Sequence, residues 1–301
     1  MTRVLVTGAS GFIGTAVCAE ALGKGWEVRG AVRSFLKPLV KGVEACPIGD
    51  LRDAVWEPAL QGVDAVIHLA GVAHQIHGQN AEAVYHAINC AAAERLARAA
   101  ARAGVRRFVF VSSIKVNGES TPPHRPFRSG DSPQPQDRYA RSKWAAEQAL
   151  ANVAAETRLE TVVVRPPLVY GPGVGANFLR LVRLVDSRLP LPFGAIRNSR
   201  SLIFVGNLAQ LLALCATSPA AAGRTLLASD GNDVSTPQLA RKIGAALGFT
   251  TRLLPFPSAL LPSRLVDSLA VDSSDTRRVL DWLPRFTLDE GIAQTVKGYR
   301  H

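Results

Sequence analysis

Short apolar runs alternate with longer stretches of mixed polarity along the first half of the chain. The pattern predicts strands over residues 4–7, 27–32, 65–69, 107–112 and 160–165, with helices between them over residues 13–24, 58–61, 80–103 and 138–155. Strands and helices that alternate in this way form βαβ units. We therefore expect an α/β protein built on a doubly wound parallel sheet.

The second half of the chain has a different pattern, in which Pro and Gly interrupt shorter elements from Arg165 onward. This change places a boundary near Gly171. With 301 residues, the chain is also longer than a usual single domain. We predict a large first domain over residues 1–171 and a smaller α/β region over residues 172–301, some segments of which return to the first domain.

Three glycines join the first predicted strand to the first predicted helix. Gly8 allows a tight turn, Gly11 allows the backbone to approach a pyrophosphate, and Gly14 allows the helix to lie close to the sheet. The start of the helix then presents backbone amides to phosphate oxygens. The turn therefore predicts a dinucleotide site in the first domain, with contacts at Gly8, Ser10, Gly11, Phe12 and Ile13.

A second motif, Tyr139 and Lys143, lies on the helix predicted over residues 138–155. A separation of four residues brings the two side chains onto one face of a helix. An ammonium group beside a phenol favours the phenolate, so we expect Lys143 to lower the pKa of Tyr139 from its usual value of about 10. A tyrosine of this kind can exchange a proton with a substrate oxygen.

Together with the segment 112–118, which reads Ser-Ser-Ile-Lys-Val-Asn-Gly, the two motifs resemble the extended short-chain dehydrogenase/reductases, the NAD(P)-dependent sugar-nucleotide epimerase/dehydratase family. The resemblance extends over essentially the entire chain. It implies a Rossmann-type first domain and catalytic roles for Ser113, Tyr139 and Lys143, with Lys143 also holding the nicotinamide ribose.

The chain departs from the family's dehydratases directly after Ser113. Those enzymes carry an Asp-Glu pair where this chain has Ile114 and Lys115. Neither side chain can do the proton-transfer chemistry of a carboxylate, so we do not expect dehydration of a hexose.

The end of the second predicted strand favours NADP(H) over NAD(H). Apolar Val32 cannot hold a ribose diol, whereas Arg33 can hold a 2′-phosphate. If Arg33 is only the first exposed loop residue, NAD(H) remains the alternative. The resemblance implies further cofactor contacts at Asp50, Leu51, Leu69, Ala70, Gly71, Asn89, Tyr139, Lys143, Pro167 and Leu168.

In the second region, the resemblance implies a site for a nucleoside-diphosphate sugar, most simply a UDP-linked one. Asn177 and Arg200 match positions that contact the diphosphate, and Leu191 and Phe193 match a strip that packs on the base. The substrate-binding residues that it implies are Ser113, Lys115, Asn177, Leu191, Phe193, Arg200 and Arg264.

The net charge of +11 invites a nucleic-acid hypothesis, but the basic residues are scattered and no nucleic-acid-binding module is recognisable. Anionic small ligands explain the charge more simply. No membrane span or secretory signal is visible, so we expect a cytoplasmic protein. The cysteines are Cys18, Cys46, Cys90 and Cys215, whose spacing predicts neither a metal site nor disulfides. The resemblance implies a homodimer.

Several functions fit these motifs. Arg33 favours an NADP(H)-dependent reductase of a 4-keto nucleoside-diphosphate sugar, for example a UDP-4-keto-6-deoxy-hexosamine. The first alternative is a UDP-sugar 4-epimerase with tightly bound NAD, and another is a reductase of small carbonyl compounds. A catalytically idle redox sensor is disfavoured, because Ser113, Tyr139 and Lys143 are all present.

Overall fold

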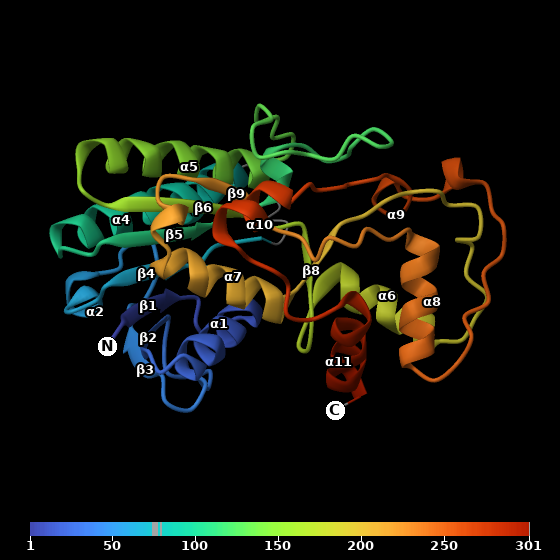
Figure 1. The fold of residues 1–301 in the computed structure, drawn as a ribbon, viewed down its shortest axis with the longest axis horizontal. Coiled ribbons are helices and arrows are strands. Elements are labelled where there is room, and N and C mark those ends of the chain that lie inside the picture. Colours follow the sequence, from blue (N-terminus) through green and yellow to red (C-terminus); the bar gives the residue numbers. More distant parts are fainter. Residues whose placement is uncertain (74–77, 79, 301) are drawn as a thin grey trace.

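The structure, a computed structural model, describes residues 1–73, 78 and 80–300. Its centre is a parallel sheet of seven strands in the order β3-β2-β1-β4-β5-β6-β9 (Figure 1). This sheet confirms the predicted doubly wound α/β fold. The strands are β1 (Arg3–Thr7), β2 (Glu27–Val32), β3 (Glu44–Pro47), β4 (Ala65–His68), β5 (Arg107–Val111), β6 (Glu160–Arg165) and β9 (Thr225–Leu227).

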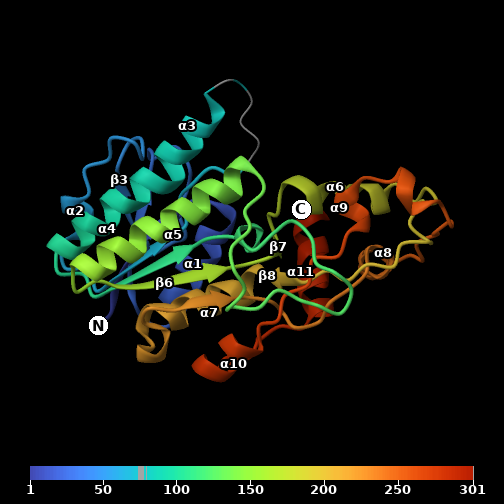
Figure 2. The same cartoon turned by 90° about the horizontal axis from the view of Figure 1, so that it is seen from above.

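Helices cover both faces of the sheet. Helices α1 (Phe12–Gly23) and α7 (Val205–Thr217) pack together on one face, and α4 (Ala92–Arg102) and α5 (Arg138–Glu156) lie on the other with the short α2 (Glu57–Leu60) (Figures 1 and 2). The side chains between sheet and helices form two cores, which contain Leu211 and Val17 on the first face and Leu96 and Leu150 on the second.

Two elements differ from the sequence-based prediction. Strand β3 was not predicted, because it is a four-residue edge strand with mostly exposed side chains and no apolar run. Pairing with β2 holds it in place, supported by an ion pair of 3.1 Å between Arg29 and Glu44. The helix predicted over residues 80–103 is divided into α3 (Ala81–Tyr85), a π-helical turn (His86–Ala91) and α4.

The C-terminal region has a core of its own, in which Tyr170, Phe178, Phe193 and Phe204 are buried. It contains a two-stranded parallel sheet of β7 (Leu168–Tyr170) and β8 (Leu202–Phe204). Around it lie α6 (Ala176–Asp186), α8 (Thr236–Ala246), α9 (Ser263–Val266) and α11 (Leu288–Arg300), whereas α10 (Ser274–Leu280) packs beside β9. Strand β9 follows α7 and pairs with β6, so the chain returns to the main sheet after β8.

Candidate active site

The carboxyl ends of β1, β4, β5 and β6 lie at one edge of the main sheet, because all four strands run in the same direction. A ligand site is expected at such an edge. A cavity of about 170 Å³ lies there. Its walls bring together predicted residues from five separate segments, namely Ile13, Leu69, Gly71, Ser113, Tyr139, Lys143 and Pro167.

Lys143 is buried beneath this cavity. Its ammonium donates a hydrogen bond of 2.9 Å to the carbonyl oxygen of Val111 at the end of β5, and lies 4.6 Å from the centre of the Phe110 ring. Burial lowers the pKa of Lys143 to about 8, and the charge of Glu147 acts against that shift. The Val111 contact fixes the lysine at the strand end.

Tyr139 has a raised pKa, contrary to the sequence-based expectation. Burial raises the pKa of Tyr139 to about 12, and the hydrogen bond with Ser113 only reduces that shift. The expectation was wrong because it considered the Lys143 charge and not the loss of water around the phenol, which disfavours the phenolate. At neutral pH, Tyr139 is therefore a protonated phenol within hydrogen-bond reach of Ser113.

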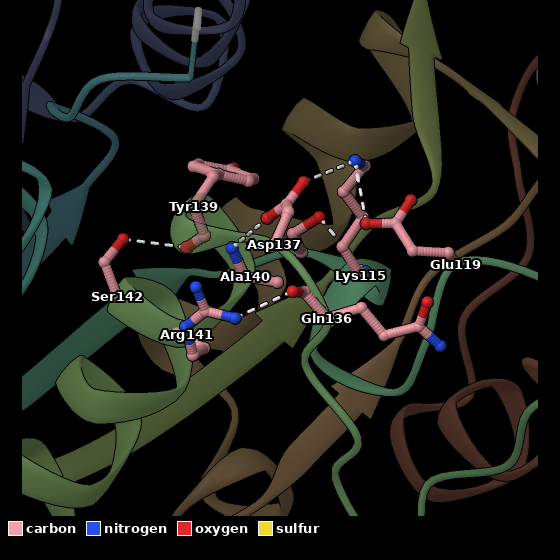
Figure 3. A network of polar contacts seen from close by, with 9 residues as sticks. Lys115, Glu119, Gln136, Asp137, Tyr139, Ala140, Arg141 and Ser142 are labelled. Carbon is pink, nitrogen blue, oxygen red and sulfur yellow. Dashed lines mark hydrogen bonds and ion pairs between the residues drawn. The ribbon is translucent and has the colours of Figure 1, made fainter. Parts of the chain in front are cut away.

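Lys115 joins the loop after β5 to the start of α5 (Figure 3). Its ammonium donates hydrogen bonds of 2.8 Å to Asp137 and 3.0 Å to Glu119. The other oxygen of Asp137 accepts the backbone N–H of Ala140 at 2.6 Å and so caps the helix that carries Tyr139. The ammonium of Lys115, which was predicted to bind substrate, thus forms ion pairs with two carboxylates of the protein.

A buried carboxylate–guanidinium pair, which the sequence analysis did not identify, lies behind the cavity. Arg165 at the end of β6 donates to Glu147 on α5 through two hydrogen bonds of 3.0 and 2.5 Å. The Ser112 hydroxyl donates to Glu147 at 2.5 Å, and Arg165 also donates to the side-chain oxygen of Asn117 at 2.9 Å. The one available signal was spacing, since Glu147 follows Lys143 by four residues on the same helix face.

His68 at the end of β4 was also not identified from sequence. The Thr7 hydroxyl accepts the backbone N–H groups of Leu69 and Ala70, each at 3.1 Å, and lies 2.8 Å from His68 Nδ1. Because the two lone pairs of the hydroxyl are used by these N–H groups, Thr7 donates its proton to Nδ1, and the ring proton lies on Nε2. Burial and then the nearby Lys143 charge lower the pKa of His68 to about 3, so the ring is neutral. These contacts fix the turn that carries Leu69, Ala70 and Gly71.

Asn89 lies in the π-helical turn and connects two sides of the cavity. Its side-chain oxygen accepts the Val72 backbone N–H at 2.8 Å, and its amide nitrogen donates to the Val72 carbonyl and to Ser142 on α5, both at 3.0 Å. A Cβ at Gly71 would lie 2.8 Å from this oxygen, so glycine is required for the close approach. Asn89 thus supports α5 rather than Lys143 directly.

The predicted phosphate-binding turn begins α1. Gly8 has a φ of +68°, and a Cβ at Gly14 would lie 2.1 Å from the Gly8 carbonyl oxygen. Among the described residues, no side chain caps this helix and no acidic residue lies in its first turn. Its first amides are therefore free to face an anion. Ser10, Gly11 and Phe12 line a wide groove of about 1000 Å³ here, whereas Ile13 lines the smaller cavity.

The predicted adenosine contacts lie beyond β2. Arg33 is exposed, directly after buried Val32. Asp50 is engaged by Arg52, which donates to its two oxygens at 2.9 and 3.0 Å and lowers the pKa of that carboxyl. Leu51 is partly buried against the second core.

The predicted substrate residues differ in exposure. Leu191 and Phe193 are buried in the C-terminal core, whereas Asn177 and Arg264 are exposed. The guanidinium of Arg200 donates to the carbonyl oxygens of Arg264 and Asp267 at 3.1 and 3.0 Å.

The predicted cofactor contact at Leu168 stays a prediction. The neighbouring Val169 lines the cavity, and Leu168 is exposed outside its walls. Successive side chains of a strand point to opposite faces, and β7 begins at Leu168, so only one of the two can face the cavity.

We expect Glu147→Gln to lower the free energy of unfolding by about 3 kcal/mol or more, because it leaves the buried Arg165 charge without its counter-ion. The matched control is Glu156→Gln at the end of α5, whose partner Arg98 is solvent-accessible. That change is expected to stay within about 0.5 kcal/mol. Denaturant unfolding measures both, and equal losses would contradict a special role for the buried pair.

Neutral His68 predicts a distinct dependence of stability on pH. As the pH falls below about 6.5, the unfolded chain binds a proton at this ring, whereas the folded protein binds one only near pH 3. The free energy of unfolding therefore decreases as the pH is lowered from about 6.5 to about 3. His68→Asn keeps an acceptor for Thr7 and removes the titration. We expect its unfolding free energy to fall less steeply, by up to about 1.4 kcal/mol per pH unit. Identical pH profiles would show that folding does not lower the pKa of His68.

Comparison with known proteins agrees with this geometry. Residues 4–227 match the NAD dependent epimerase/dehydratase family. A protein named UDP-glucose 4-epimerase from Vibrio cholerae is 39% identical over 98% of this chain and 95% of its own length. A second relative, N-acetyl-alpha-D-glucosaminyl-diphospho-ditrans,octacis-undecaprenol 4-epimerase from Escherichia coli, is 26% identical over 89% of this chain and 80% of its own.

A solved structure described as MoeE5 in complex with UDP-glucose and NAD is also similar. It superposes with a TM-score of 0.82 at 28% sequence identity, over 99% of this chain and 98% of that one. The family match spans the main sheet, and the matches to the Vibrio cholerae protein and to the solved structure extend through the C-terminal region. The chain is a member of the NAD-dependent epimerase/dehydratase family and thus an extended short-chain dehydrogenase/reductase.

Proposed function

We propose that this enzyme interconverts two epimers of a UDP-linked hexose at carbon 4, with NAD retained between the two half-reactions. The observation that carries the proposal is the meeting of Ser113, Tyr139 and Lys143 in one cavity at the sheet edge, next to the turn of α1. The similarity to the Vibrio cholerae protein named UDP-glucose 4-epimerase supports this chemistry over a simple reduction.

The residues present fit a dinucleotide. The uncapped start of α1 would hold the pyrophosphate, and the missing Cβ atoms at Gly8 and Gly14 keep the turn close to the sheet. Lys143 would hold the nicotinamide ribose from beneath the cavity. When bound, the nicotinamide supplies the acceptor and donor for the hydride of carbon 4.

Tyr139 would move the proton of the sugar hydroxyl. Its raised pKa keeps the phenol protonated at neutral pH, so it can donate to the oxygen of a 4-keto sugar as the hydride returns. In the opposite direction, the hydrogen bond with Ser113 lowers the pKa of Tyr139 and so favours the phenolate that accepts the proton. Ser113 would also bond the reacting oxygen and orient it toward Tyr139.

The contacts of Lys115 do not favour a dehydratase. Ile114 is buried, and Lys115 is bound to Asp137 and Glu119, so neither position offers a carboxylate to a substrate carbon. The Lys115 ammonium instead holds the start of α5, and with it Tyr139, against the loop that begins at Ser113. Redox chemistry at carbon 4 needs no further acid–base pair.

The substrate would extend from this cavity into the C-terminal region. Arg200, with Arg264 and Asn177, would bind the diphosphate, and the buried Leu191 and Phe193 would shape the wall beside the base. The names of both relatives compared above by sequence contain a sugar diphosphate. We therefore propose that this part of the ligand binds at these residues.

A second candidate is an NADP(H)-dependent reductase of a 4-keto UDP-sugar. Arg33 supports it, because this guanidinium is exposed directly after β2, where it can bind a 2′-phosphate. The carboxylate of Asp50 lies close enough to feel the Arg33 charge but is already bound by Arg52.

The test is to purify the protein, identify any dinucleotide released on denaturation, and add UDP-glucose or UDP-GlcNAc without cofactor. We expect bound NAD and formation of the galacto epimer. Tyr139→Phe should lose about 100-fold or more in turnover with the same unfolding midpoint, because the proton donor is gone. Consumption of NADPH with a 4-keto UDP-sugar and no epimer would favour the reductase. Reduction of small carbonyl compounds without affinity for UDP would reject both.

A further inference from the structure

Exposed apolar side chains concentrate at one end of the molecule. Of the eleven large apolar residues exposed among those the structure describes, five lie in two short segments, with Leu260 at 72%, Leu189 at 65% and Leu254 at 54% exposure, joined by Leu184 and Phe256. Isolated exposed leucines are ordinary on protein surfaces, whereas a group of them is characteristic of an interaction site.

The two segments pack against each other in space. The Leu191 N–H donates to the Arg252 carbonyl at 2.9 Å, and the Leu254 N–H donates to the Leu191 carbonyl at 2.8 Å. Gly194 donates in turn to the Leu254 carbonyl at 2.9 Å. Both segments lie at the end of the molecule that carries α8 and α9, opposite the end that carries α2 and β3 (Figures 1 and 2).

The same segments are strongly basic. Residues 180–197 and 250–264 contain six arginines and one carboxylate, a net charge of +5. The carboxylate, Asp186, already accepts a hydrogen bond of 3.0 Å from the Tyr299 hydroxyl. All six arginines are exposed, and none of them forms an ion pair with another residue that the structure describes. They are Arg180, Arg183, Arg188, Arg197, Arg252 and Arg264.

We propose that this basic apolar end, residues 180–197 and 250–264, docks on the surface of an anionic lipid bilayer. Unpaired arginines are attracted to acidic headgroups, and the apolar side chains beside them insert between the lipids. The contact is peripheral, because no helix in the described parts of the chain is long and apolar enough to cross a bilayer.

Two features favour a bilayer over a second copy of this chain. A two-fold contact would bring two surfaces of charge +5 together, which is electrostatically unfavourable. In addition, Leu254, Phe256 and Leu260 stand on an irregular segment that contains Pro255, Pro257 and Pro262. Proline limits the freedom that this backbone would otherwise lose when it inserts.

The test is flotation of the full chain with phosphatidylcholine vesicles, with and without phosphatidylglycerol. We expect binding only with the anionic lipid and weaker binding as salt is added. Leu254→Ser/Leu260→Ser should weaken it about tenfold or more, because it removes the inserted side chains. The matched control is Phe35→Ser/Leu36→Ser, which changes two exposed apolar residues elsewhere and should bind as the parent does.

The double variant Arg188→Gln/Arg252→Gln tests the electrostatic contribution, and we expect it to lose binding to anionic vesicles. Unfolding midpoints are measured for every variant to show that it is folded. Equal losses in the Leu254/Leu260 and Phe35/Leu36 variants would overturn the proposal, as would equal binding to both lipid compositions or none to either. A concentration-dependent dimer that disappears in Leu254→Ser/Leu260→Ser would assign the surface to a second copy instead.

Discussion

The buried pair of Glu147 and Arg165 is the interaction on which the arrangement of the candidate active site depends. Parallel strands bring their ends to one edge by hydrogen bonding alone, but nothing in that pairing fixes the height of α5 above the sheet. The pair does so, because it joins α5 to the end of β6, while Ser112 adds a contact to the end of β5. Both charges are buried, so removal of either residue would leave the other without a counter-ion. Lys143 lies one helical turn from Glu147 on α5.

A second set of contacts fixes the parts that this pair does not reach. Asp137 caps α5 and is bound by Lys115, so the start of the helix is tied to the loop that begins at Ser113. On the other side, Thr7 and neutral His68 hold the turn after β4. The result is a cavity in which a protonated phenol, a hydroxyl and an ammonium lie close together, each on a segment with its own anchor. Such preorganisation is what proton and hydride transfer require.

Much of the fold could be predicted from the sequence, because each buried strand is an apolar run and each helix has a matching periodicity. Strand β3 could not, since an exposed edge strand of four residues has no pattern of its own. Ser113, Tyr139 and Lys143 were identified from sequence motifs, and in the structure they line one cavity. The Glu147–Arg165 pair and His68 were missed because their partners are distant in sequence. The pKa of Tyr139 was mispredicted because burial cannot be judged from a spacing of four residues.

In the proposed reaction, the hydride taken from carbon 4 of a UDP-sugar is returned to the same sugar without leaving the protein. Its most direct test is conversion of a UDP-hexose carrying deuterium at carbon 4, in the presence of excess unlabelled NADH and NAD, followed by mass spectrometry and NMR of the product. We expect an epimer that keeps the deuterium at carbon 4. Deuterium in the added dinucleotide, or its replacement by hydrogen in the sugar, would contradict it.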